Sequence, residues 1–238
     1  MPGSESLAER VRAVRARIEE AAGRVDRDPA TIEIVAVTKT FPPEAVAAAL
    51  GVGCRHVGEN YVQEARDKRA VAAEGAVWHL IGGLQTNKAR AAVETFDWIH
   101  TVDSPRLGQA IDAEAARAGR RVPVLLQVNV AGEAQKRGTT PEDLVTLARA
   151  VLGLPALTLS GLMTIPPEAD DPEDVRPHFR RLRELRDRVQ DGLGVELPHL
   201  SMGMSDDFVI AVEEGATMVR LGRALFGPRG PRSWREGS

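Results

Sequence analysis

Lys39 is the residue whose type and position most directly suggest chemistry. It ends the apolar run Ile34-Val35-Ala36-Val37-Thr38-Lys39, a pattern that predicts a buried strand. Burial disfavours the charged ammonium, so the pKa of a buried lysine falls and its neutral amine can attack a carbonyl carbon to form a Schiff base. The spacing alone equally allows a strand-end lysine whose ammonium reaches water. The residues at the ends of the other predicted strands are therefore needed to choose between these two interpretations of Lys39.

Polar residues and glycines follow the other apolar stretches, at the points where strands would end. Asn60 follows the second stretch, and the last two stretches run into serine, glycine and arginine residues. Glycine lets the backbone approach a ligand closely, and hydroxyl groups bond anions well. We therefore favour Ser201 and Gly222 as phosphate ligands. We interpret Ser205 as the cap of a helix that begins at Asp206.

The elements that must position these residues are short apolar stretches. Several are nearly continuous in apolar residues, as expected for parallel strands that are covered on both faces. The predicted strands are 32–39, 55–59, 77–82, 98–103, 122–129, 157–165, 199–203 and 217–222.

Helical patterns separate these strands, at 44–50, 60–73, 87–94, 105–118, 141–152, 172–191 and 206–214. Their alternation with strands predicts an α/β protein, a single (β/α)₈ TIM barrel with functional residues at the C-terminal ends of the strands. A further amphipathic helix from Ser4 to about Gly23, capped by Ser4, is expected to cover the gap where an eighth outer helix would lie. We expect residues 1–238 to form one domain, with 228–238 as a flexible tail.

The composition narrows the class of protein. The chain has 238 residues, and its 31 Lys+Arg nearly balance 34 Asp+Glu. Because the charges are interspersed, neither nucleic acid nor a membrane is favoured as a partner. Cys54 is the only cysteine, which excludes an intrachain disulfide, and no apolar run approaches the ~20 residues of a membrane span. We expect a cytoplasmic protein.

The histidines indicate no metal site. His56, His79, His100, His178 and His199 show no paired i, i+4 spacing of the kind that zinc sites use. We interpret His79 and His100 as strand residues whose polar atoms are satisfied within the fold.

Short motifs occur in a fixed order along most of the chain: Val37-Thr38-Lys39-Thr40, Gly58-Glu59-Asn60-Tyr61-Val62-Gln63-Glu64, Trp78-His79-Leu80-Ile81-Gly82, Leu84-Gln85-Thr86-Asn87-Lys88, Gln127-Val128-Asn129, Gly161-Leu162-Met163, Ser201-Met202-Gly203-Met204-Ser205-Asp206-Asp207 and Val219-Arg220-Leu221-Gly222. In this order and spacing they resemble the pyridoxal-phosphate-binding homeostasis proteins. That family is related to the N-terminal barrel of alanine racemase, of fold type III.

The resemblance implies a site for pyridoxal 5'-phosphate. Lys39 would carry the cofactor as an internal aldimine. Asn60 would lie near the phenolic oxygen of the ring, and Arg220 would face the pyridine nitrogen. The phosphate would be held by Ser201, Gly222 and the backbone at Arg223.

Arg223 departs from the family pattern. Family members commonly have Ser or Thr at this position, so one hydroxyl contact to the phosphate is in doubt. The backbone N–H of Arg223 could still serve. Its guanidinium either pairs with the phosphate or points outward.

Arg220 bears on whether such a protein would be an enzyme. A guanidinium is effectively always protonated, so it cannot accept a proton and the ring nitrogen beside it would stay neutral. Enzymes that use this cofactor as a strong electron sink generally place an acid there. In alanine racemase a second acid/base group comes from a C-terminal domain and a partner subunit, whereas this chain stops about 16 residues after the eighth strand.

Three functions are weighed on this basis. The first is a monomeric protein that stores pyridoxal phosphate on its lysine and delivers it to the apo-forms of pyridoxal-phosphate enzymes, within vitamin B6 homeostasis and without efficient catalysis of its own. The second is a pyridoxal-phosphate-dependent amino-acid racemase. The third is a Schiff-base aldolase that uses Lys39 on a phosphorylated sugar. A visible absorption band removed by borohydride would separate the first two from the third.

Overall fold

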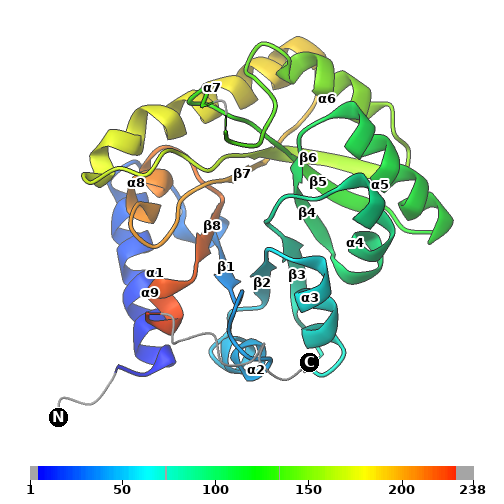
Figure 1. The fold of residues 1–238 in the computed structure, drawn as a ribbon. Helices are drawn as coiled ribbons and strands as arrows, with labels where there is room; N and C mark the ends of the chain where they lie inside the picture. Colours follow the sequence, from blue (N-terminus) through cyan, green and yellow to red (C-terminus); the bar gives the residue numbers. More distant parts are fainter. Residues whose placement is uncertain (1–4, 73, 134, 229–238) are drawn as a thin grey trace.

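Eight parallel strands close into a barrel in the computed structural model (Figure 1), which describes residues 5–72, 74–133 and 135–228. Each strand pairs with the next along the chain, and β8 returns to β1. The predicted (β/α)₈ fold is therefore confirmed. The strands are β1 Glu33–Val37, β2 His56–Glu59, β3 Val77–Leu80, β4 Trp98–Val102, β5 Val122–Gln127, β6 Leu157–Met163, β7 His199–Ser201 and β8 Met218–Leu221.

Helices surround this barrel, as predicted. They are α1 Leu7–Gly23, α2 Glu44–Gly51, α3 Val62–Arg69, α4 Ala89–Thr95, α5 Pro105–Arg117, α6 Leu144–Leu152, α7 Arg176–Leu193, α8 Phe208–Glu213 and α9 Arg223–Phe226, with 3-10 turns η1 Pro29–Thr31, η2 Thr86–Lys88 and η3 Pro172–Val175. Among the described residues, no helix combines the length and the hydrophobicity needed to cross a membrane.

The N-terminal helix α1 takes the place expected for it in the outer ring. It packs against α8 and α9, and Figure 1 shows it beside them at the edge of the barrel. Its cap differs from the prediction. Ser6 Oγ accepts from the Glu9 N–H at 3.3 Å, while the Glu9 carboxylate accepts from the Ser6 N–H at 2.7 Å. This reciprocal pair satisfies two helix-end donors, whereas Ser4 lies outside the described residues, as does most of the predicted tail, 229–238.

The interior of the barrel is unusually polar. Aliphatic side chains fill only part of it, in a cluster formed by Val35, Leu125, Met163 and Met218. Bulky branched side chains usually dominate such an interior. Here several inward positions on β2, β3, β4, β7 and β8 carry histidine, serine and arginine instead.

Strand register brings the predicted site residues to one end of the barrel. Val37 of β1 pairs with Gly58 of β2, and Lys39 and Asn60 each follow two residues later, beyond the C-terminal ends of these strands. On the other side, Ala36 of β1 pairs with Leu221 of β8, and Gly222, which follows β8, lies beside Val37. Successive residues point to alternate faces, so the odd-numbered residues of β1 share the inner face with Val35.

Candidate functional site

Lys39 lies two residues beyond β1, in a turn at the mouth of the barrel, and its side chain is half-buried. It is therefore more exposed than the sequence pattern predicts, because β1 ends at Val37. Its neighbours are tightly constrained. Thr38 is fully buried, and Thr40 has a φ of 67°, in the left-handed region that β-branched residues rarely adopt.

A buried ionic cluster holds both of these threonines. Lys68 Nζ donates to Glu59 Oε1 at 2.7 Å and to Glu64 Oε1 at 2.9 Å. It also donates to the Thr38 carbonyl oxygen at 2.6 Å. Thr38 Oγ1 donates to Glu59 at 2.6 Å, and the Thr40 N–H donates to Glu64 at 2.6 Å. These five residues, called here the Lys68 cluster, fix the backbone on both sides of Lys39.

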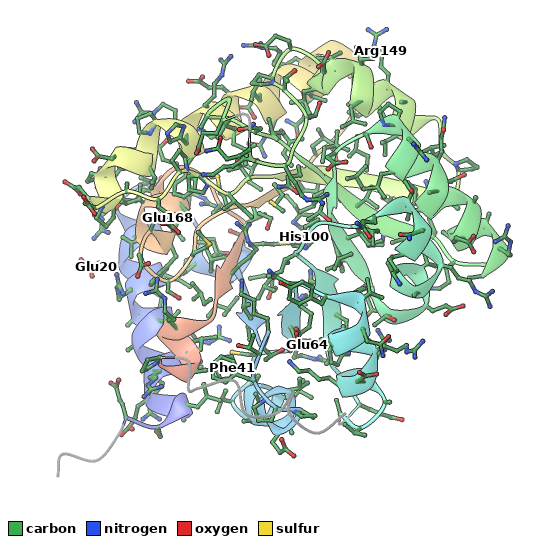
Figure 2. The ribbon with its side chains drawn as sticks, in the orientation of Figure 1. Glu20, Phe41, Glu64, His100, Arg149 and Glu168 are labelled. Carbon is green, nitrogen blue, oxygen red and sulfur yellow. The ribbon has the colours of Figure 1, made fainter. Side chains whose placement is uncertain are left out.

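The charges of this cluster sit almost entirely out of water. Lys68 is 1% exposed, Glu59 0% and Glu64 2%. Burial raises the pKa of Glu59, while the ammonium of Lys68 opposes that rise. Sequence reasoning missed the cluster because Glu64 and Lys68 have the i, i+4 spacing of an ordinary surface ion pair. Figure 2 shows Glu64 on α3, facing the barrel.

Arg220 lies deeper in the barrel, on β8. Its Nη1 donates to Ser201 Oγ and its Nη2 to the Thr164 carbonyl oxygen, both at 2.8 Å. Burial lowers the pKa of Arg220 to about 10, with the nearby Asp207 carboxylate opposing the shift. The guanidinium therefore stays protonated at neutral pH, in an orientation fixed by two acceptors.

The two serines of the 201–207 segment differ in what they contact. Ser201 is fully buried, and its hydroxyl bonds both Arg220 and, at 2.9 Å, His100 Nδ1. Ser205 is half-buried, and its Oγ accepts from the Ala224 N–H at 3.1 Å. The interpretation of Ser205 as the cap of the following helix is therefore wrong. That helix, α8, begins at Phe208 after Asp207, and no side chain caps it.

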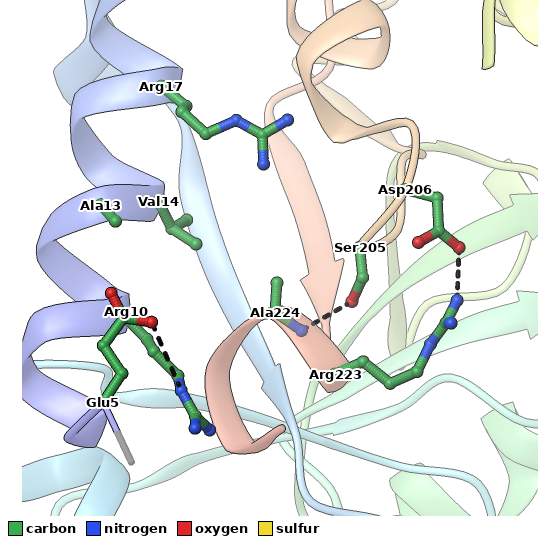
Figure 3. A pocket seen from close by; sticks show the side chains of 9 residues that line it. All are labelled: Glu5, Arg10, Ala13, Val14, Arg17, Ser205, Asp206, Arg223 and Ala224. Carbon is green, nitrogen blue, oxygen red and sulfur yellow. Dashed lines mark hydrogen bonds and ion pairs between the residues drawn. The ribbon is translucent and has the colours of Figure 1, made fainter. Parts of the chain in front are cut away.

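Arg223 forms an exposed ion pair. Its guanidinium pairs with the Asp206 carboxylate, and both side chains are more than half exposed. Ser205 and Arg223 line one side of a surface pocket of about 330 Å³, and Arg17 of α1 lines the other (Figure 3).

Gly222 and Gly203 differ in whether the fold needs glycine. Gly203 has a φ of 92°, and a Cβ there would come within 2.5 Å of the Ala211 Cβ, so the fold itself requires glycine. A Cβ on Gly222 would make only an ordinary 3.5 Å contact with the Val37 carbonyl oxygen. Steric contact therefore does not require glycine at position 222.

The backbone of Asn60 packs closely against Gly82. A Cβ on Gly82 would lie only 2.2 Å from the Asn60 carbonyl oxygen, so the loops after β2 and β3 pack directly on each other. Lys39, Asn60 and Gly222 thus gather at the barrel mouth, while Ser201 and Arg220 lie below them in the interior. Within the described ranges, no group of three or more His, Cys, Asp or Glu side chains could hold a metal ion.

These features define an α/β-barrel protein with a half-buried lysine beyond the C-terminal end of its first strand. The match to a known family is equally clear. The chain belongs to the family of the alanine racemase N-terminal domain, whose model matches residues 10–230.

Curated relatives match over nearly their whole length. A protein of Pseudomonas aeruginosa is 48% identical over 225 residues, which cover 94% of this chain and 96% of the relative. One of Aquifex aeolicus is 45% identical over 222 residues, covering 93% and 97%. Both are named pyridoxal phosphate homeostasis protein.

Solved structures show the same barrel. PipY of Synechococcus elongatus with pyridoxal phosphate bound is 37% identical and has a TM-score of 0.82, with 93% of this chain and 100% of that chain covered. Alanine racemase of Corynebacterium glutamicum is 16% identical, with a TM-score of 0.72 over 97% of this chain and 63% of that one. At this identity the racemase shows a likeness of fold alone.

Proposed function

We propose that this protein binds pyridoxal 5'-phosphate, holds it through a Schiff base to Lys39, and stores and delivers it in cytoplasmic vitamin B6 homeostasis. The observation that carries the proposal is a lysine in the turn after β1, at the end of the barrel where β2 and β8 lead into Asn60 and Gly222, in a chain 37% identical to PipY solved with this cofactor. The names of the curated relatives support the same role.

The groups at the strand ends suit this cofactor. When bound, pyridoxal phosphate supplies an aldehyde, which condenses with a primary amine with loss of one water. Lys39 would provide that amine, and Asn60 an amide for the phenolic oxygen. For the phosphate we favour the Ser205 hydroxyl together with the backbone at 222–223, because the Ser201 hydroxyl already bonds two buried groups.

Arg220 is the residue that would face the ring nitrogen, and its chemistry favours storage over catalysis. A guanidinium with a pKa of about 10 donates hydrogen bonds but holds its proton at neutral pH. It cannot protonate the ring nitrogen, which strong carbanion stabilisation generally requires. We therefore propose a carrier whose partners are apo-forms of pyridoxal-phosphate enzymes, acting as a monomer.

The test uses the full-length protein loaded with pyridoxal phosphate. We expect a visible absorption band that fades as an apoenzyme is titrated in and gains activity. A protein that forms no such band but cleaves a phosphorylated sugar would support the aldolase instead.

The racemase alternative is tested by proton exchange in deuterated solvent. We expect the loaded protein to exchange no α-proton of alanine, serine or lysine at a meaningful rate. Loss of a well-placed acid/base group costs about 10²–10⁴-fold in rate, and the neutral ring nitrogen adds to that loss. Exchange near the ~10 s⁻¹ typical of enzymes would make the protein a racemase.

A further inference from the structure

Three histidines form a continuous hydrogen-bonded ladder through the barrel interior. His56 Nδ1 lies 2.8 Å from His79 Nε2, and His79 Nδ1 lies 2.8 Å from His100 Nε2. The three side chains come from the adjacent strands β2, β3 and β4. His79 and His100 are fully buried, and Figure 2 shows His100 in the middle of the barrel. We call this set the histidine ladder.

The ladder joins two charged groups of opposite sign. At its inner end His100 Nδ1 bonds Ser201 Oγ, which in turn accepts from Arg220. At its outer end His56 Nε2 lies 3.5 Å from a carboxylate oxygen of Glu33, whose side chain is half exposed at the N-terminal rim. The ladder therefore runs from the surface of the barrel to the buried arginine.

The charged ends fix the direction of every hydrogen bond. Arg220 can only donate, so Ser201 accepts from it and has its own proton left for His100 Nδ1. His100 must then carry its proton on Nε2 and donate it to the next ring. Repeated along the ladder, this leaves His56 with an Nε2–H directed at the Glu33 carboxylate.

The opposite direction is disfavoured at both ends. It would place a bare His56 Nε2 lone pair against the Glu33 carboxylate. It would also turn the Ser201 hydroxyl into a double acceptor and leave its proton without an acceptor among the described residues. A buried donor without an acceptor costs about 1–3 kcal/mol, so the first direction wins.

We propose that His56, His79 and His100, each a neutral Nε2–H tautomer, are positioning residues for Arg220. The ladder directs the Ser201 proton away from Arg220, so that Ser201 Oγ always presents a lone pair to the guanidinium. The link to pyridoxal phosphate rests on the proposed function, whereas the tautomers are a property of the protein alone.

The histidine ladder orients Ser201 and Arg220 and does not carry protons to the pyridine ring of the cofactor. A relay needs a terminal group that both takes and gives up a proton, and Arg220 with a pKa of about 10 does neither readily at neutral pH. Burial, followed by the neighbouring histidines, holds the pKa of His79 and His100 well below the ordinary value, which agrees with neutral rings. The half-buried His199 and the carboxylate of Asp207 are the other titratable groups near this path.

The first test is nitrogen-15 NMR of the full chain with labelled histidine, at neutral pH and without added cofactor. We expect a pyrrole-type Nε2 and a pyridine-type Nδ1 for each of the three rings. Single substitutions of His178 and His199 remove the two remaining histidine signals from the spectrum. An Nδ1–H tautomer or an imidazolium at His79 or His100 would overturn the proposal.

The second test compares two variants at the centre of the ladder. Glutamine at position 79 keeps a donor and an acceptor, whereas leucine keeps neither. We expect His79→Leu to weaken pyridoxal phosphate binding about 10-fold and His79→Gln to restore most of that loss, since one buried hydrogen bond is worth about that factor. Equal affinities in the two variants, with loss of stability only, would reduce the ladder to a structural role.

These two readouts separate this inference from the proposed function. If the wild-type protein bound no pyridoxal phosphate, the proposed function and the positioning role would both fail, while the tautomer pattern could still stand. If the wild-type protein binds pyridoxal phosphate, the affinity of His79→Leu reports on the ladder alone. Lys39 is not part of the ladder and lies beyond the C-terminal end of β1.

Discussion

Lys39 differs from the other lysines of the chain in its surroundings. Lys68 is enclosed by two carboxylates, Lys136 pairs with Glu133 at 2.8 Å, and Lys88 is exposed on η2. Lys39 lies half-buried in the turn after β1, at the C-terminal end of the barrel strands. Position, more than residue type, is therefore the basis on which we propose Lys39 as the cofactor lysine.

The variant Lys39→Ala should lose the visible absorption band of the loaded protein and keep its fold. A half-buried side chain at a strand end contributes little to stability, so we expect the free energy of unfolding to change by less than about 1 kcal/mol. Absorbance after loading and urea unfolding measure the two effects. Lys88→Ala is the matched control, and a band that persists in Lys39→Ala would contradict the assignment.

Ser205→Ala should weaken retention of pyridoxal phosphate by roughly 0.5–3 kcal/mol, the range for a hydrogen bond to a charged group. Affinity for pyridoxal, which lacks the phosphate, should stay the same.

Arg223→Thr should be neutral or tighten binding of pyridoxal phosphate, because the guanidinium of Arg223 pairs with Asp206 at the surface. A large loss in Arg223→Thr would instead identify this arginine as a phosphate ligand.

The strands and helices follow closely from the sequence pattern, but their ends do not. All strands except β2 stop one or two residues earlier than the apolar runs predict, because the chain leaves the β-sheet there to form the loops of the site. The run ending in Lys39 is the clearest case. A hydrophobic pattern records burial, and a residue that directly follows a strand, such as Thr38, can be buried without belonging to the sheet.

The sequence predicted the site residues that stand at strand ends. It did not predict which side chains from distant segments contact one another. Lys39, Asn60 and Gly222 stand at strand ends, so their gathering follows from the barrel fold. The partners of Ser201 and the burial of Lys68 depend on how distant segments meet. Histidines 23 and 21 residues apart gave no local signal of a ladder, although each occupies an inward position of its strand.

The Lys68 cluster should be essential to the β1 turn. Lys68→Met would leave the Glu59 and Glu64 carboxylates buried together, which typically costs about 3–5 kcal/mol. Urea unfolding measures the loss, and the exposed Lys88→Met serves as the control. A loss below about 1 kcal/mol would show that the cluster is not the constraint on Thr38 and Thr40.

The whole barrel should become less stable in mild acid because of its buried histidines. The pKa values of His79 and His100 in the folded state lie well below the unfolded value of about 6.5. Below that pH the unfolded chain binds more protons, so the free energy of unfolding falls as pH falls, by up to about 1.4 kcal/mol per unit for each ring. Above about pH 7 the effect is absent.

Chemical unfolding between about pH 5 and 7 measures this dependence. The raised pKa values of Glu59 and Asp207 act in the opposite direction, so the informative quantity is the difference in slope between wild type and His79→Gln. We expect that difference to approach about 1.4 kcal/mol per pH unit. Identical slopes would mean that the pKa of His79 is the same in the folded barrel as in the unfolded chain.

The most direct test of a pyridoxal phosphate carrier on Lys39 is to load the full-length protein, reduce it with borohydride and map the modified peptide by mass spectrometry. We predict a single reduced pyridoxyl group per chain, on Lys39, with Lys68, Lys88 and Lys136 unmodified. Modification of another lysine in place of Lys39, or no covalent group at all, would contradict the account.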